Sequence, residues 1–301
     1  MKISELLQEL DEKELKFQIY NEKSFNCLAL VASNLEESTC IFIDDNKYIN
    51  SIKNNVTMII TTEDLRGGLI NSQYGLCIVN EPRLTFFKIH NHLADTKEYK
   101  RGKFKTKIGI NCNISPLAYV AKNNVTIGNN TIIEEFVSIR ENTTIGNNCI
   151  IRMGTKIGGE GFEFKPLNDS IMAVKHMGGV KIADNVELQQ NNCIDKAVYP
   201  WDNTIIEDYS KTDNFVHIAH GVKMGKRVRV AASAMIAGRV IIRDDVWIGP
   251  AAVIINGIEL GEKSNISLGS VVTQNVEANQ KVTGNFAIDH RKFIEFIKHI
   301  R

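Results

Sequence analysis

Two histidines, three residues apart within Asp213–Val222, are the side chains of this sequence best suited to move a proton. Histidine titrates near neutral pH, so it can act as a general base toward an attacking amine or hydroxyl group. We predict that His220 is this catalytic base. The neighbouring residues Asp213, Asn214 and His217 are predicted to bind the acceptor or to orient His220. For His217, a solvent-exposed position without a function is the alternative.

These side chains lie within a repeat of six residues. Every sixth residue from Ile206 to Val272 is aliphatic, with the sole exception of Thr212. The same register extends back to Ile182, broken only at Pro200, and a second register runs from Ile127 to Ile157. A period of six fits neither an amphipathic helix nor an alternating strand, and it is the known signature of a parallel β-helix.

The repeat predicts a parallel β-helix in which three hexads close one coil of about 18 residues, and it resembles the left-handed hexapeptide-repeat family, which implies a left-handed coil. The aliphatic side chains point inward, and the small side chain four positions later fits a corner, which makes Cys112 and Cys149 corner residues. Glycines that directly follow the aliphatic positions are expected to supply unusual turn dihedral angles. One coil beyond His220 lies Gly238. A glycine there is expected to leave room for a thioester, and its N–H group to face an oxyanion.

The hexads divide the chain into three parts. Residues 1–105 lack them and read as a small α/β domain, with helices at Lys2–Glu14 and Arg83–Leu93 and short strands between them. Residues 106–276 form the predicted β-helix, which makes the protein mainly β, and residues 277–301 form a tail ending in a short amphipathic helix. Two register breaks, Gly158–Gly179 and Lys196–Asn203, are predicted loops.

The composition excludes several classes of protein. The formal net charge is +1, from 36 Lys and Arg against 35 Asp and Glu, so the chain lacks the overall positive charge that would indicate nucleic acid as a partner. The 6 cysteines form no CxxC pair, which disfavours a disulfide framework or a zinc knuckle. We find neither a signal peptide nor an apolar run long enough to span a membrane, and we predict a cytoplasmic protein.

The sequence also resembles the UDP-3-O-acylglucosamine N-acyltransferases of lipid A biosynthesis. The likeness rests on Phe42–Tyr48, on Gly154–Phe162 and on Asp213–Val222. It implies that Phe42 and Tyr48 clasp a uracil ring. It also implies that His220 is the catalytic histidine of the family.

Several positions depart from the pattern of that family. Its Asp-Arg-Gly segment is Asp195-Lys196-Ala197 here, a second functional histidine is replaced by Ile258, and a methionine that limits acyl length corresponds to Ser270. The longer C-terminal helices of the family are absent. Instead, residues 269–273 and 284–287 resemble sugar-modifying transferases that use coenzyme A.

Together these observations predict an N-acyltransferase acting on the amine of a nucleotide-linked amino sugar, UDP- or dTDP-linked, in surface glycan biosynthesis. The donor would be a phosphopantetheine thioester, either acyl-CoA or acyl carrier protein, with no tightly bound cofactor and no metal. A homotrimer is expected. The alternative is the UDP-3-O-acylglucosamine N-acyltransferase itself. A trimeric sugar-binding scaffold and a zinc-dependent carbonic anhydrase are more remote, and the latter needs three converging histidines.

Overall fold

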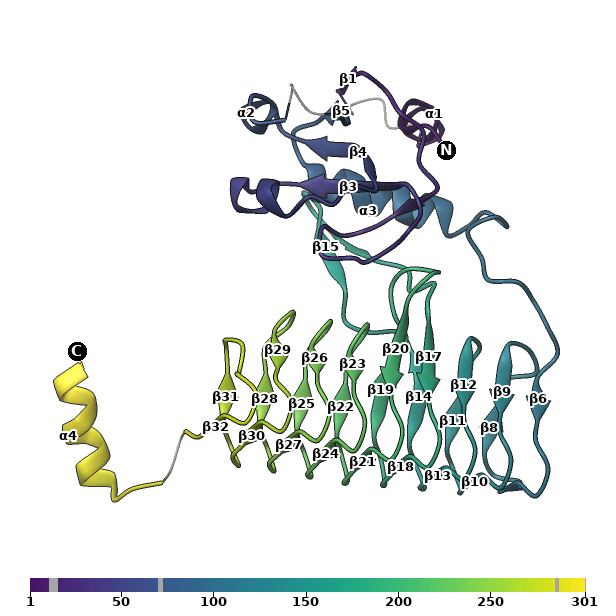
Figure 1. Cartoon of the computed structure of the whole chain (residues 1–301), viewed down its shortest axis with the longest axis vertical. Coiled ribbons are helices and arrows are strands. Elements are labelled where there is room, and N and C mark those ends of the chain that lie inside the picture. The colour runs from purple at the N-terminus through teal and green to yellow at the C-terminus, as the bar shows by residue number, and fades with distance from the viewer. Residues whose placement is uncertain (11–15, 70–72, 285–286, 301) are drawn as a thin grey trace. The chain divides into compact units, whose positions relative to one another are not determined.

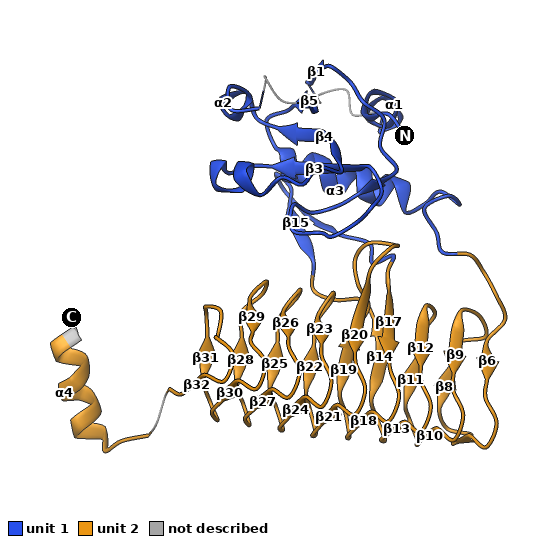
Figure 2. Ribbon diagram, viewed as in Figure 1, with its two compact units in different colours: residues 1–101, 163–177 blue, residues 102–162, 178–301 orange. Residues whose placement is uncertain are grey.

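The computed structural model describes residues 1–10, 16–69, 73–284 and 287–300. The chain forms two compact units (Figure 2). Unit 1 comprises residues 1–101 and 163–177, and unit 2 comprises residues 102–162 and 178–301. The first predicted loop is therefore divided: its middle, residues 163–177, belongs with the N-terminal residues rather than with the β-helix that it interrupts.

Unit 1 is built on a five-stranded sheet of order β1-β5-β4-β3-β2. The strand β1 is antiparallel to β5, and all other neighbours are parallel. The strands are β1 (Gln18–Tyr20), β2 (Cys27–Leu28), β3 (Thr39–Ile43), β4 (Val56–Thr61) and β5 (Gly75–Ile78). The helices are α1 (Ile3–Glu9), η1 (Asn46–Ser51), α2 (Glu63–Arg66) and α3 (Pro82–Leu93). The end of the predicted helix Lys2–Glu14 lies outside the described residues.

A hairpin of β15 (Phe164–Pro166) and β16 (Ile171–Ala173) completes unit 1. The carboxamide of Asn91 on α3 donates to the carbonyl of Ala173 at 2.8 Å and accepts the N–H of Lys175 at 2.9 Å. Next to it, the buried ring of His90 lies 2.8 Å from the carbonyl of Lys175 and 3.1 Å from the hydroxyl of Tyr99. These bonds fix the hairpin to α3, which explains why it belongs to unit 1.

Unit 2 is a parallel β-helix with three ladders of strands, and Figure 1 shows its coils stacked in succession. One ladder holds β6 (Lys107–Ile108), β9 (Val125–Ile127), β12 (Thr143–Ile145), β17 (Gly179–Ile182), β20 (Asn203–Ile206), β23 (Lys223–Met224), β26 (Ile241–Ile242) and β29 (Glu259–Leu260). The second holds β7 (Asn113–Ile114), β10 (Ile132–Ile133), β13 (Ile150–Ile151), β18 (Glu187–Leu188), β21 (Lys211–Thr212), β24 (Arg229–Val230), β27 (Trp247–Ile248), β30 (Asn265–Ile266) and β32 (Lys281–Val282). The third holds β8 (Tyr119–Val120), β11 (Ser138–Ile139), β14 (Lys156–Gly159), β19 (Cys193–Asp195), β22 (His217–Ile218), β25 (Met235–Ile236), β28 (Val253–Ile254) and β31 (Val271–Val272).

The interior of the β-helix is filled by the aliphatic hexad positions, all buried from Ile127 to Ile157 and from Ile206 to Val272. The predicted left-handed parallel β-helix with its small N-terminal α/β unit is confirmed. It extends further than predicted, because β32 pairs with β30 and carries the ladder beyond residue 276. The predicted C-terminal helix is α4 (His290–Ile300). Among the described residues, no helix combines the length and the apolarity that a membrane crossing requires.

The corners of the coils are built differently from what the sequence suggested. The residues with positive φ are mostly non-glycine, and asparagine is the commonest of them, as at Asn130 (φ 55°). Gly128, which follows an aliphatic position, is not among the residues of positive φ. A Cβ there would lie 2.6 Å from the carbonyl carbon of Gly146 in the next coil. Close approach of successive coils, not an unusual dihedral angle, therefore requires glycine at this position.

The small side chains fill the corners as predicted. Cys149 is fully buried, and its thiol lies 3.1 Å from the carbonyl of Ala183. Burial raises the pKa of this thiol to about 11, so it stays protonated and unreactive at neutral pH. Cys112 contacts the carbonyl of Gly128 in the same way, at 3.0 Å.

Candidate active site

His220 lies at the corner between β22 and β23 and is buried, with 8% of its surface exposed. Its ring extends toward the next coil, where Gly238 occupies the stacked position. A Cβ on Gly238 would lie 2.7 Å from Cε1 and 2.8 Å from Nε2 of His220. The space above Gly238 is thus taken by the imidazole itself, not left open for a thioester as the sequence suggested. The absence of a side chain at Gly238 allows the imidazole to approach the backbone of this coil closely.

His217 lies within strand β22. Its Nε2 is 2.9 Å from Oδ2 of Asp195, which ends strand β19 in the preceding coil. The carboxylate is largely buried and the imidazole is 41% exposed. The hydrogen bond to Asp195 raises the pKa of His217, against the opposing effect of burial. The sequence showed Asp195 only as a departure from a family segment and did not pair it with His217.

Charged groups flank the residue after His220. Gly221 has a φ of +73°, and a Cβ there would lie 3.4 Å from Cγ of Arg239 and 3.5 Å from Oδ2 of Asp202. Asp202 also accepts a hydrogen bond from the ammonium group of Lys223. The corner that carries His220 is therefore polar on its outer side, in contrast to the aliphatic interior of the coil.

The second register break, Lys196–Asn203, is an ordered insertion that lies against this corner. Its Tyr199 is buried, and the rings of Tyr199 and Trp201 stack with centroids 5.3 Å apart and planes 2° apart. The insertion encloses Gly178, where a Cβ would lie 2.6–2.7 Å from three carbonyl oxygens of residues 197–202. This packing gives Tyr199 and Trp201 fixed positions.

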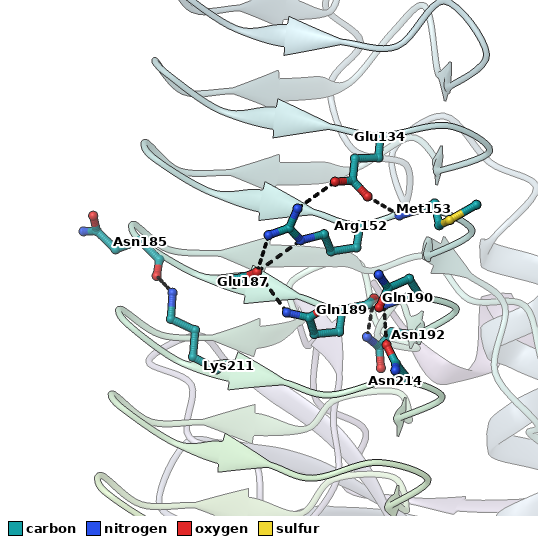
Figure 3. A network of polar contacts seen from close by, with 10 residues as sticks. All are labelled: Glu134, Arg152, Met153, Asn185, Glu187, Gln189, Gln190, Asn192, Lys211 and Asn214. Atoms are coloured by element: carbon teal, nitrogen blue, oxygen red, sulfur yellow. Dashed lines mark hydrogen bonds and ion pairs between the residues drawn. The ribbon is translucent and has the colours of Figure 1, made fainter.

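Asp213 and Asn214 lie at a different corner, between β21 and β22. Asp213 is exposed, and its Oδ1 accepts the N–H of Asn214 at 2.8 Å. The side-chain oxygen of Asn214 accepts the N–H of Gln190 from the preceding coil at 3.0 Å (Figure 3). Asn214 thus links two coils. The structure therefore places these two residues at the opposite end of β22 from His220, and their role in binding stays a prediction.

The same region carries a network of ion pairs that links three coils. Figure 3 shows Arg152 between Glu134 and Glu187, at distances of 2.8 Å and 2.9 Å. Gln189 adds a hydrogen bond of 2.9 Å to the carboxylate of Glu187. Because the guanidinium of Arg152 binds one carboxylate in the coil before it and one in the coil after it, we interpret the network as a structural link along the outer face of the β-helix.

Phe42 and Tyr48 lie in unit 1, on β3 and on η1. The ring of Phe42 packs against Phe86 and Phe87, with centroids 5.1 Å and 6.1 Å away. The guanidinium of Arg83 lies 5.5 Å from the centroid of Phe42. Tyr48 is 38% exposed. The ammonium group of Lys47 lies 4.9 Å from the centroid of the Tyr48 ring, so each of the two rings has a cation beside it, and Phe42 is in addition packed against two phenylalanines.

A second feature of unit 1 was missed in the sequence. The parallel strands β3, β4 and β5 end at the same edge of the sheet, the usual place for a ligand in an open α/β sheet. A cavity of about 640 Å³ opens at this edge. Its lining includes Lys16, Gln18, Asp64 and Asn80. No sequence motif marks it, because its residues come from three separate segments, 16–18, 62–64 and 78–80.

Comparison with known proteins places these features in a family context. Residues 124–159 and 203–238 match the family described as "Bacterial transferase hexapeptide (six repeats)". A UDP-3-O-acylglucosamine N-acyltransferase of Delftia acidovorans is 35% identical over 136 residues, which are 45% of this chain and 40% of that protein. A protein of the same name from Albidiferax ferrireducens is 35% identical over 133 residues, 44% of this chain and 40% of the relative. The predicted resemblance is thus confirmed, and the chain matches these relatives over about two fifths of their length.

Solved structures show the same fold. The UDP-N-acetylglucosamine acyltransferase of Arabidopsis superposes with a TM-score of 0.52 at 25% identity, covering 60% of this chain and 62% of that one. The protein of that name from Campylobacter jejuni gives a TM-score of 0.54 at 22% identity, covering 65% and 79%. The second likeness concerns the fold alone.

Proposed function

We propose that this protein is an N-acyltransferase that moves an acyl group from a phosphopantetheine thioester to the amine of a nucleotide-linked glucosamine. The observation that carries the proposal is the buried imidazole of His220, which packs against Gly238 within hexapeptide coils. The names of the relatives support this reaction class. Acyl transfer to an amine requires a base and a donor for the oxyanion, and this corner offers both.

In the proposed reaction, His220 accepts a proton from the amine as the amine nitrogen attacks the thioester carbon. The carbonyl oxygen becomes an oxyanion, which the N–H of Gly238 would stabilise. This N–H takes part in none of the backbone hydrogen bonds of the described residues. When the tetrahedral intermediate collapses, the C–S bond breaks and the imidazolium returns the proton to the leaving thiolate. The products are an amide and a free thiol.

The pair of His217 and Asp195 is proposed to bind the acceptor sugar. The raised pKa of His217 favours the imidazolium form, and its 41% exposure leaves part of the ring open to a ligand. A charged imidazolium is a strong hydrogen-bond donor to a hydroxyl or phosphate oxygen. Asp213 and Asn214 remain further candidates at the next corner, and the nucleotide base is assigned to Phe42 and Tyr48.

The relatives favour an acceptor that already carries a 3-O-acyl chain, which was the alternative and not the first choice of the sequence analysis. One argument against it loses force in the structure. Ser270, which replaces a methionine that limits acyl length in the family, is a buried corner residue with 3% exposure. The packing of the corner accounts for a small side chain here, so the choice between the two acceptors does not rest on Ser270. The resemblance of residues 284–287 to coenzyme A-using transferases includes positions 285 and 286, which lie outside the described residues.

The donor and the assembly are also proposals. The thioester is carried either by coenzyme A or by an acyl carrier protein. We further propose a homotrimer, because a closed cyclic assembly would give each site walls from two subunits. Analytical ultracentrifugation tests this proposal, and an active monomer would contradict it.

A thiol-release assay tests the proposed function. UDP-3-O-acylglucosamine, UDP-glucosamine and dTDP-linked amino sugars are each combined with short- and long-chain acyl-CoA and acyl carrier protein. We expect release with the 3-O-acylated acceptor, and a loss of about 10²–10⁴ in turnover for His220→Ala with the fold intact. Activity of His220→Ala within threefold of wild type would remove His220 from the mechanism. Absence of release with every amino sugar would refute the proposed function.

A further inference from the structure

A single hydroxyl group connects the two histidine segments of unit 2. The side chain of Thr204, on β20, is fully buried. Its Oγ1 donates to the backbone carbonyl of Asp195 at 2.6 Å and accepts the N–H of Gly221 at 2.9 Å. Asp195 holds His217, and Gly221 directly follows His220. The hydroxyl of Thr204 is thus linked to His217 through Asp195, and to His220 through the neighbouring residue Gly221.

Thr204 occupies a position that is otherwise filled mainly by valine. The β-strand register stacks Val125, Thr143, Val180 and Thr204 on one another in successive coils. All four side chains are buried. Shape therefore does not require threonine here, since valine has the same shape and fits the stack. A buried hydroxyl carries a desolvation cost, and it is favourable where it forms hydrogen bonds that a methyl group cannot form.

The insertion Lys196–Asn203 explains why a hydroxyl is needed. At the equivalent corners of later coils, a backbone carbonyl one coil earlier accepts the N–H: Arg239 donates to His220 and Gly257 to Gly238, both at 3.0 Å. By the same register, Gly221 would donate to Asp202. Within the insertion, however, the carbonyl of Asp202 points toward Gly179 and accepts its N–H at 3.1 Å. The hydroxyl of Thr204 takes its place.

We propose that Thr204 is a positioning residue, whose hydroxyl fixes the backbone at Gly221 and at Asp195 and thereby sets the places of His220 and His217. This proposal rests on the proposed function for its catalytic consequence. Thr204 does not touch the reacting atoms. It acts through the backbone on either side of the inserted loop, where the regular coil-to-coil hydrogen bond is missing.

The sharpest test compares two identical substitutions in the same stack. Thr204→Val removes a hydroxyl with two partners, whereas Thr143→Val removes one whose oxygen has no hydrogen-bond partner among the described residues. We expect Thr204→Val to lower kcat by about 10- to 100-fold, because small displacements of a catalytic group cost that much. Thr143→Val should stay within twofold of wild type. Thr204→Ser, which keeps the hydroxyl, should recover most of the activity.

A second measurement needs no substrate. Hydrogen exchange followed by mass spectrometry reports the protection of the Gly221 amide, which should exchange faster in Thr204→Val and not in Thr143→Val. If valine at 204 prevents folding, alanine at 204 and at 143 gives the same comparison without the added methyl group.

The outcomes separate the two proposals. Unchanged exchange at Gly221, or equal kcat for the two valine variants, overturns the role of Thr204. A Thr204→Ser variant as slow as Thr204→Val also overturns it. Wild-type protein without thiol release would refute the proposed function, and the exchange measurement would then decide on Thr204 alone.

Discussion

Gly238→Ala is the substitution that most directly tests the geometry of the predicted site. A Cβ at this position would lie 2.7 Å from Cε1 and 2.8 Å from Nε2 of His220. Non-bonded heavy atoms settle at about 3.5–4.0 Å, so the imidazole must move by roughly 1 Å. The backbone itself tolerates alanine, because Gly238 is not among the residues with positive φ. The strain therefore falls on the His220 ring.

The expected consequence is a loss of catalysis with little loss of stability. A displacement of about 1 Å in a catalytic group costs about 10²-fold in rate. We expect kcat in the thiol-release assay to fall by about this factor, and the midpoint of thermal unfolding to change little. If the N–H of Gly238 binds the oxyanion, this donor is retained in the variant. The loss would then report on the position of the imidazole.

A double variant provides the control. In His220→Ala the clash partner is absent, so adding Gly238→Ala should cause almost no further loss of activity. Such strong non-additivity is what a direct contact predicts. Gly238→Ala with kcat within threefold of wild type would refute the reasoning. Additive losses of kcat in the double variant would show that alanine at position 238 does not act through the His220 ring.

Three further predictions follow from the other contacts. Asp195→Asn removes the carboxylate that raises the pKa of His217. It should raise the acceptor KM by about tenfold or more and move the alkaline limb of the kcat/KM profile toward pH 6.5, and an unshifted limb would contradict this. Phe42→Ala and Tyr48→Ala should raise the acceptor KM by about 5- to 150-fold at nearly constant kcat, with unchanged KM in both showing that the base binds elsewhere, for example at the edge of the sheet. Burial lowers the pKa of His90 to about 4. Unit 1 should therefore lose about 3 kcal/mol of stability as pH falls from about 6.5 to 4, where the unfolded chain binds a proton that the folded chain excludes. Hydrogen exchange of α3 and the β15–β16 hairpin as a function of pH checks this, and His90→Gln should flatten the dependence.

The β-helix could be predicted from the sequence because its interactions repeat. Each coil places an aliphatic side chain at every sixth position, so the residues from Ile206 to Val272 that follow this step are the ones that fill the core. Small corner residues such as Cys149 follow the same rule. The glycines were misread for a related reason: the sequence shows where glycine recurs, but not whether it serves a dihedral angle or a close approach, as at Gly128.

The candidate site was predictable only where a local segment or the repeat itself defines it. His220 stands in a recognisable segment, and Gly238 follows from a step of one coil. The partnership of His217 with Asp195 joins residues 22 positions apart across an insertion, where the step of 18 no longer holds. The hairpin of residues 163–177 was assigned to a loop for the same reason, since its contacts with Asn91 are formed with a distant segment.

The insertions that obscure the repeat are thus also what makes this region of the β-helix chemically distinct. At the equivalent corners of the next two coils, the N–H groups of Arg239 and Gly257 each donate to a backbone carbonyl of the coil before, so no side chain is needed as the acceptor there. The loop Lys196–Asn203 breaks this pattern beside His220, removes the usual acceptor of Gly221 and requires a hydroxyl at Thr204 instead. A position where the aliphatic repeat tolerates a buried polar residue next to an insertion therefore points to the functional part of the coil. By this argument Thr204 is informative and Thr143, a threonine of the same stack without hydrogen-bond partners among the described residues, is not.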